Sequence, residues 1–326
     1  MASGLSRPDA PWRGRRSGGT PEPGQISFTL AHLSDLHVTP IRGGSLWDFA
    51  NKRALGRLSW LRKRRHEHRP EILGGLLADL DRQGPDHVAL TGDLTNVGLR
   101  SEIEAALPWL RALGGPSRVS LVPGNHDAYA APVEPRGFAP WNDYMGEPGI
   151  EIDASRYRFP YVRRAGPIAL IGLSSAIPTP VGLASGRLGS EQLEDLEARL
   201  EALGREPCCR VVLIHHPPVG AGQAPRRRLT DAPALRAVLA RQGAELILHG
   251  HIHRPSVERI EGPAGPIPVV GVASSSARGR KPGRRASYHL YRFDPAAGGR
   301  GFRIRLRRRV LEPSGDRFRE DQELPL

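Results

Sequence analysis

Short apolar runs alternate along the chain with stretches in which apolar residues recur every three to four positions. The short runs are typical of buried strands, and the longer periodic stretches are typical of amphipathic helices. The pattern predicts helices at 70–84, 101–115, 190–204 and 232–243, the second with Ser101 as its N-cap and Glu104 completing a capping box. It predicts strands at 26–35, 87–93, 118–127, 167–175, 209–218, 244–253, 267–276, 286–294 and 301–310.

Strands that alternate with helices indicate βαβ units around a buried sheet. The last three predicted strands have no helix between them, which indicates a second sheet beside the first. We therefore expect an α/β fold of the four-layer α+β type, with two packed mixed β-sheets flanked by helices. We expect one catalytic domain at 25–310 with a basic insertion at 42–69, between a disordered tail at 1–24 and a C-terminal tail at 311–326.

Composition excludes several classes of protein. Among the 326 residues no apolar run approaches the roughly 18 residues of a membrane-spanning helix. Residues 1–25 lack the apolar core of a secretory signal. The only two cysteines, Cys208 and Cys209, are adjacent, which excludes a disulfide framework. We therefore expect a soluble cytoplasmic protein.

The net charge of +13 is concentrated in two segments. Residues 42–69 carry a net +7 and residues 278–310 a net +11, so the rest of the chain is acidic. Such segments attract nucleic acid, nucleotides or anionic lipid headgroups, unless arginine serves only as solvated surface. In the first segment Trp47 and Trp60 either anchor a basic helix on a membrane, contact a nucleotide, or cover part of the core.

Histidine, aspartate and asparagine fall at the ends of five predicted strands, in the blocks S-D-L-H, T-G-D-L, P-G-N-H-D, H-H-P-P and H-G-H-I-H. Open α/β sheets bind ligands at the carboxyl edge of their strands, so we expect these side chains to meet. Imidazole, carboxylate and amide ligands suit manganese, iron or zinc, and one aspartate has enough oxygens to bridge two ions. The residues are Asp35, His37, Asp93, Asn125, His126, Asp127, His215, His216, His251 and His253.

In this order the five blocks resemble the signature of the calcineurin-like metallophosphoesterases, whose relatives include purple acid phosphatases and class III cyclic-nucleotide phosphodiesterases. The resemblance implies that His126 is the catalytic imidazole, oriented by a hydrogen bond that it donates to Asp127. It favours His215 over His216, because the family uses the first histidine of its block. It implies a first metal held by Asp35, His37, Asp93 and His253, and a second held by Asp93 as a bridge with Asn125, His215 and His251.

Outside these blocks the histidines have structural explanations. We expect His32, His87, His249 and His289 to pack in or beside strands, and His66 and His68 to be solvated within the basic run.

The resemblance implies a phosphoesterase with two divalent ions (Mn, Fe or Zn) that hydrolyses a phosphodiester or phosphomonoester. Its substrate is a small anionic molecule, for example a cyclic nucleotide. The basic insertion follows the first metal loop and is expected to overhang the site, with Arg42 and Arg226 as candidate substrate-binding residues.

Two alternatives remain open. One is a pyrophosphatase or phosphoesterase that acts on a lipid-linked nucleotide-sugar at an anionic membrane surface, peripherally bound through Trp47, Phe49, Leu58, Trp60 and Leu61. The other is a nucleic-acid-binding protein, which is disfavoured because the charged segments lack regularly spaced aromatic platforms. Oligomeric state is not predicted.

Overall fold

The computed structural model describes residues 27–130, 137–146, 159–220, 223–279, 283–296, 301–315 and 317–326; the tail predicted at 1–24 lies outside them. The longer helices are α1 (Lys52–Ser59), α3 (Pro70–Gln83), α4 (Arg100–Leu113), α5 (Ser190–Gly204) and α6 (Ala232–Gln242). Shorter ones are η1 (Trp47–Phe49), the π-helix η2 (Trp60–Arg64), α2 (Arg65–Glu67), η3 (Ala139–Tyr144) and η4 (Pro225–Arg227). The strands are β1 (Phe28–Leu33), β2 (His87–Leu90), β3 (Val119–Leu121), β4 (Tyr161–Ala165), β5 (Ile168–Gly172), β6 (Cys209–Ile214), β7 (Leu246–His249), β8 (Ser256–Ile260), β9 (Ile267–Gly271), β10 (Ser287–Pro295), β11 (Phe302–Leu311) and β12 (Phe318–Pro325).

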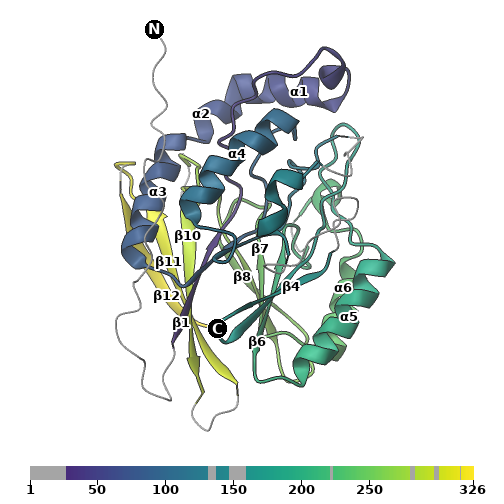
Figure 1. Cartoon of the computed structure of the whole chain (residues 1–326), viewed down its shortest axis with the longest axis vertical. Coiled ribbons are helices and arrows are strands. Elements are labelled where there is room, and N and C mark those ends of the chain that lie inside the picture. The colour runs from purple at the N-terminus through teal and green to yellow at the C-terminus, as the bar shows by residue number, and fades with distance from the viewer. Residues whose placement is uncertain are drawn as a thin grey trace.

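These strands form two mixed sheets that pack face to face (Figure 1). The first has the order β12-β11-β10-β1-β2-β3, and the second the order β4-β5-β6-β7-β9-β8. Strands β1, β2 and β3 are parallel, as are β5, β6, β7 and β9, while the remaining strands pair antiparallel. The predicted fold of two packed mixed sheets is confirmed. The last three predicted strands do not form a sheet of their own, however, because β9 pairs with β7 and β10 pairs with β1.

Alternation of side chains along each strand sets the layers. In β5, Ile168 and Leu170 belong to the core between the sheets, whereas Ala169 and Ile171 pack with α5 and α6. The same alternation divides β6, because side chains that are adjacent in a strand point to opposite faces. Helices α3 and α4 cover the first sheet and α5 and α6 the second, which gives four layers (Figure 1).

The C-terminal residues are not a tail. Strand β12 pairs with β11 at the edge of the first sheet, so the domain boundary predicted at 310 is wrong. Two features hold the pair together: Phe318 of β12 packs in the core, and opposite charges face each other across the strands. Arg307 lies 3.6 Å from Glu320 and Arg305 lies 3.9 Å from Glu323, while Arg308 pairs with Asp321. Much of the positive charge of the second basic segment therefore faces carboxylates of the same chain.

Helix α4 starts differently from the sequence expectation. Its N-cap is Leu99, and the buried Glu102 carboxylate accepts from the backbone N–H groups of Asn96, Val97 and Leu99. Ser101 instead donates its hydroxyl to the backbone oxygen of Arg42. The predicted Ser101–Glu104 capping box is therefore wrong. The Glu102 carboxylate takes its place, because it binds the backbone N–H groups of the loop that leads into the helix.

The basic insertion forms η1, α1, η2 and α2 at one end of the molecule (Figure 1). Its inner side is anchored, since Phe49 and Trp60 pack against Ile41, Val97 and Leu99. Within the described residues no helix has both the length and the apolar character needed to cross a membrane.

Candidate metal centre

The residues of the five blocks come together where parallel strands end. Asp35 and His37 follow β1, Asp93 follows β2, and Asn125 follows β3, while the second sheet contributes His215 after β6 and His251 and His253 after β7. Both sheets present their carboxyl edges to the same place, because hydrogen bonds and close contacts join side chains of the two sets.

The backbone at these residues is strained. Among the described residues, the non-glycine positions with positive φ are all candidate ligands: Asp35 (55°), His37 (46°), Asp93 (57°), His251 (69°) and His253 (52°). Left-handed backbone is unfavourable for residues with a Cβ, by about 1–2 kcal/mol each. Such strain persists only where the surrounding fold enforces it, and it gathers at functional sites. The three turns that carry these five residues therefore form one site.

The first ligand set consists of Asp35, His37, Asp93 and His253, whose donor atoms all lie within 4.8 Å of one another. His253 Nε2 is 3.0 Å from Asp35 Oδ1, and His37 Nε2 is 3.6 Å from Asp93 Oδ2. Asp35 Oδ1 is buried, and although His253 Nε2 is close to it, no well-aligned hydrogen bond reaches this oxygen within the described residues. A buried carboxylate oxygen among imidazole nitrogens fits a divalent cation, which would compensate its desolvation.

The second ligand set shares Asp93 with the first. Oδ1 of Asp93 accepts from the backbone N–H of His126, which leaves Oδ2 facing His215 Nε2 at 3.4 Å as well as His37. Asn125 Oδ1 lies 3.1 Å from His215 Nε2 and 2.9 Å from His251 Nδ1. One carboxylate oxygen therefore stands between the two groups of imidazoles.

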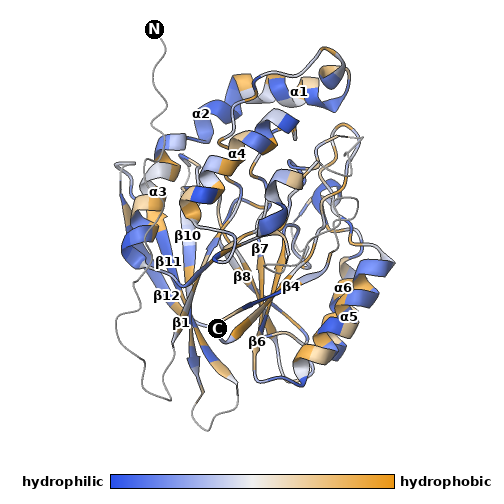
Figure 2. Cartoon of the chain, viewed as in Figure 1, coloured by the Kyte–Doolittle hydropathy of each residue, from blue (hydrophilic) through white to orange (hydrophobic). Residues whose placement is uncertain are grey.

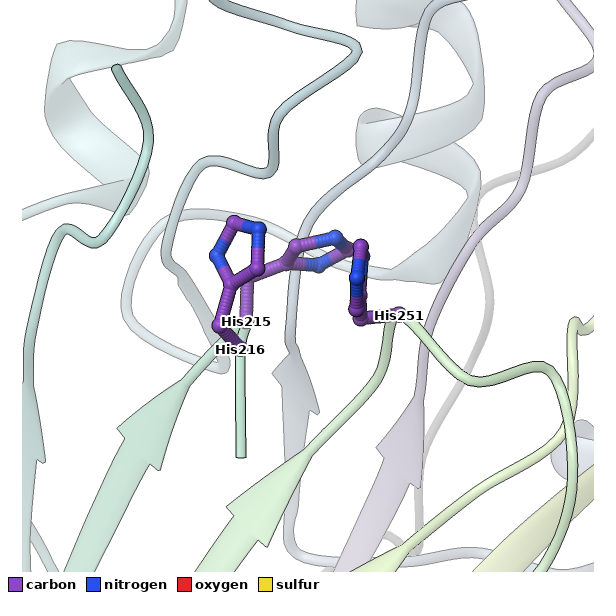
Figure 3. Close-up of side chains that lie close together, drawn as sticks. All are labelled: His215, His216 and His251. Atoms are coloured by element: carbon purple, nitrogen blue, oxygen red, sulfur yellow. The ribbon is translucent and has the colours of Figure 1, made fainter. Parts of the chain in front are cut away.

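The geometry favours His215 over His216, although both lie close to His251 (Figure 3). Nδ1 of His216 is 2.8 Å from Ser175 Oγ, and its Nε2 is 3.2 Å from the backbone oxygen of Ala184. Both of its ring nitrogens thus have partners outside the site. His215 bonds through Nδ1 alone to a backbone oxygen and directs Nε2 at Asp93 and Asn125.

Backbone carbonyls fix the tautomers of the site. The Nδ1–H groups of His37, His215 and His126 donate to the oxygens of Thr95 (2.7 Å), Thr91 (2.6 Å) and Asn96 (2.6 Å). His251 uses its other nitrogen, donating Nε2–H to the oxygen of Arg227 at 2.9 Å. A carbonyl only accepts, so the opposite nitrogen of each ring carries the lone pair available for a metal or a substrate.

Two glycines make room for the carboxylates. A Cβ on Gly124 would overlap the side chain and backbone nitrogen of Asp93, and a Cβ on Gly250 would overlap Ser34 and the carboxylate of Asp35. Glycine is required at both positions because the neighbouring loops approach so closely.

Burial controls the protonation of these groups. Burial lowers the pKa of His251 to about 3, and burial and the neighbouring His68 hold the pKa of His37 well below its usual value. Burial opposes protonation of His215 too, but Asp93 outweighs it and raises the pKa of His215 to about 9. A metal ion that binds Asp93 and His215 would therefore displace a proton.

His126 lies beside the ligands, and its ring stacks on that of Tyr129 with centroids 5.2 Å apart. Burial and the cation of Arg64 lower the pKa of His126 to about 3. The expectation that Asp127 orients this imidazole is wrong. The backbone oxygen of Asn96 accepts the hydrogen bond from His126 Nδ1 instead. The Asp127 carboxylate accepts instead from the backbone N–H groups of Asp93, Thr95 and Gly124 and thus fixes the metal-binding turns.

Three side chains of the basic insertion reach the site and were missed by sequence reasoning. Arg64 places Nη1 2.9 Å from His126 Nδ1. The ammonium of Lys52 lies 4.4 Å from the ring centroid of Tyr129, and burial followed by the charge of Arg64 lowers its pKa to about 8. His68, predicted to be solvated, is buried with its ring 4.7 Å from that of His37, because a β-bridge to Ala277 draws it inward. Residues 62–65 are four consecutive cations, so the sequence does not show which of them turns toward the site.

The predicted substrate-binding arginines are both exposed. Arg42 meets the rest of the chain through its backbone oxygen, which accepts from Ser101. Arg226 lies in η4, and the next residue contacts the site by the carbonyl bonded to His251. Within the described residues, no hydrogen bond or ion pair engages the guanidinium of Arg42 or Arg226.

The family assignment follows from the sequence comparison. The profile of the calcineurin-like phosphoesterase family matches residues 28–255, more than half of the chain. The chain belongs to this family. The predicted resemblance is confirmed, and the matched residues of the calcineurin-like phosphoesterase domain contain all five blocks.

Two curated relatives are similar over part of their length. The chain is 30% identical over 186 residues to a "probable cyclic nucleotide phosphodiesterase" of Synechococcus sp., covering 56% of this chain and 64% of the relative. It is 29% identical over 202 residues to the glycerophosphodiester phosphodiesterase GpdQ of Enterobacter lignolyticus, covering 60% of this chain and 59% of the relative. The chain thus spans about three fifths of the length of these relatives.

Solved structures share the calcineurin-like phosphoesterase fold. The purple acid phosphatase PPD1 of yellow lupin (Lupinus luteus) superposes with a TM-score of 0.56 at 13% identity, over 92% of this chain and 53% of that protein. A dimetal phosphatase from Danio rerio superposes with a TM-score of 0.55 at 14% identity, over 91% and 98%. At these identities the likeness concerns the fold alone.

Proposed function

We propose that this protein is a dinuclear metal-dependent phosphodiesterase acting on a small anionic substrate. The observation that carries the proposal is the position of Asp93 Oδ2, between His37 Nε2 at 3.6 Å and His215 Nε2 at 3.4 Å, which joins two ligand sets through one carboxylate. Two divalent ions bound there would activate a water molecule and neutralise charge on a phosphate. Manganese, iron and zinc all suit the ligands.

His126 is the proposed proton carrier for the leaving oxygen. It is buried beside both ligand sets, and its Nδ1–H is committed to the oxygen of Asn96. Its exchangeable position is therefore Nε2. The low pKa of His126 leaves Nε2 without a proton in the free protein, and the charge of an anionic phosphate bound beside it would raise that pKa so that Nε2 carries one. A positioned imidazole matters most when the leaving group is a poor one, because an alkoxide needs a proton in the transition state more than a phenolate does.

Arg64 is the proposed partner of a phosphate oxygen. Since His126 Nδ1 already donates to the oxygen of Asn96, it has no lone pair with which to accept from Arg64 at 2.9 Å. Within the described part of the chain no carboxylate forms an ion pair with Arg64, although burial lowers its pKa. A partly buried guanidinium without an acceptor beside a catalytic imidazole is suited to bind a phosphate oxygen.

The substrate class is a phosphodiester, and a cyclic nucleotide is the more specific proposal. The names of the two curated relatives, both phosphodiesterases, support this class. Arg42 and Arg226 remain predicted contacts for the part of the substrate beyond the phosphate, since both are exposed and without a described partner for their guanidinium groups.

The test is a panel of phosphate esters assayed with manganese-reconstituted protein. The panel contains bis(p-nitrophenyl) phosphate, p-nitrophenyl phosphate, 3′,5′-cyclic AMP and glycerophosphocholine. We expect turnover of diesters and loss of both turnover and bound metal in Asp93→Ala. Asp81→Ala, at an exposed position on α3, is the matched control and should behave as wild type.

Two results would contradict the proposal. One is metal-loaded wild type that hydrolyses no member of the panel. The other is Asp93→Ala with normal metal content and normal turnover.

A further inference from the structure

Exposed apolar side chains gather on the basic insertion. Of the eight large hydrophobic side chains that are exposed among the described residues, five lie at positions 46–61, and Leu46 and Trp47 are 91% and 86% exposed. Two more, Val181 and Leu183, lie in a loop that Lys52 joins to the insertion by a hydrogen bond to the oxygen of Leu183. Figure 2 shows hydrophobic and hydrophilic residues interleaved along α1. A gathered apolar surface of this kind marks an interaction site, whereas scattered exposed leucines do not.

The same surface has positive charge that the chain does not neutralise. The two acids of the insertion are used internally, since Asp48 accepts from Ser45 and Glu67 accepts from the backbone N–H of Gly279. Within the described residues, no carboxylate forms an ion pair with the exposed cations of the insertion, which are Arg42, Arg57, Arg62, Lys63 and Arg65. The surface therefore combines apolar tips with cations that no described carboxylate neutralises.

The apolar tips are held outward by a packed inner side. Phe49 and Trp60 fill the contact with Val97 and Leu99, and Arg53 donates to the oxygen of Val97 at 3.0 Å. Trp47, which could have covered the core as Trp60 does, points instead to solvent. Helix α1 thus packs on the domain with one side, while no described residue covers its other side.

We propose that the outer side of the insertion docks on an anionic lipid bilayer. Leucine and tryptophan next to arginine and lysine is the combination that inserts at the boundary of headgroups and acyl chains, while the cations contact anionic headgroups. Nucleic acid would use the cations and would stack a base on Trp47, but it would leave the exposed leucines in water. Because Arg64 of the same insertion reaches His126, docking would hold the proposed catalytic site close to the membrane surface.

Vesicle flotation tests this proposal on the full chain, with neutral phosphatidylcholine vesicles and with vesicles that also contain phosphatidylglycerol. We expect binding to the anionic vesicles only, weakened by salt. Leu46→Ser combined with Trp47→Ser should weaken it about tenfold or more. Arg62→Gln, Lys63→Gln and Arg65→Gln together should weaken it about fivefold per cation removed. Val257→Ser, which removes an exposed apolar side chain on β8, should bind as wild type.

The outcomes that overturn the proposal are distinct from failure of the proposed activity, because binding is measured without turnover. Wild type that does not float with anionic vesicles overturns it. So does unchanged binding of the Leu46→Ser, Trp47→Ser variant, which would show adsorption by charge alone. A dimer in light scattering that this variant abolishes, with no vesicle binding by wild type, would assign the surface to a second copy of the chain.

Discussion

Replacing Arg64 with glutamine removes a cation that has no described carboxylate partner and lies 2.9 Å from the imidazole of His126, the proposed proton carrier. Glutamine keeps a donor and much of the length but loses the charge. A charge-assisted hydrogen bond to a transition-state phosphate is worth about 2–3 kcal/mol. This corresponds to a loss of about 30- to 150-fold in kcat/KM.

The assay is hydrolysis of bis(p-nitrophenyl) phosphate by manganese-loaded protein, with metal content measured on the same samples. Arg64→Lys should recover part of the rate, because an ammonium retains the charge but not the planar fork of donors. Arg64→Ala should be partly rescued by added guanidinium, which a purely structural role would not allow. Arg62→Gln, at an exposed position in the same π-helix, is the matched control.

Wild-type kcat/KM in Arg64→Gln, with normal metal content, would refute a contact between Arg64 and the transition-state phosphate. An equal loss in Arg62→Gln would show instead that the net charge of the insertion, and not contact by Arg64, assists the reaction.

Three further predictions concern His126, Gly124 and two buried histidines of the first sheet. His126→Ala should retain both metals yet lose about 10²- to 10⁴-fold in turnover of an alkyl diester, and less with p-nitrophenyl leaving groups; equal losses on both would exclude proton transfer by His126. Gly124→Ala should lower metal stoichiometry, measured by elemental analysis, because its Cβ would displace Asp93, whereas Gly74→Ala on α3 has free space and should not. Burial lowers the pKa of His87 and His289 to about 3. The unfolded chain takes up their protons first below about pH 6.5, so the two together should lower the free energy of unfolding by about 4 kcal/mol between pH 7 and pH 5. In denaturant titrations the change for His289→Gln should be about 2 kcal/mol smaller than that for wild type; an unaltered pH dependence would contradict the burial argument.

The sequence alone determined nine of the strands, the layers and the ligand blocks, whereas strands β4, β8 and β12 were not predicted. Along a strand such as 167–175, successive side chains point to opposite faces of the sheet. This local period needs no tertiary information. Strand ends are also visible locally, so the meeting of Asp35, Asp93 and His251 at one edge was predictable from parallel strands.

Tertiary structure decided which of several adjacent side chains enters the site. His215 and His216 have the same chemistry. They differ because both ring nitrogens of His216 have hydrogen-bond partners, at Ser175 and Ala184. Arg64 stands among four consecutive cations, and the π-helix together with the anchoring of Trp60 selects it. Strand β12 has only a few apolar residues, and Phe318 in the core together with ion pairs to the arginines of β11 places it. In each case the deciding contact joins residues far apart in the chain, so its free energy does not exist until the fold brings them together.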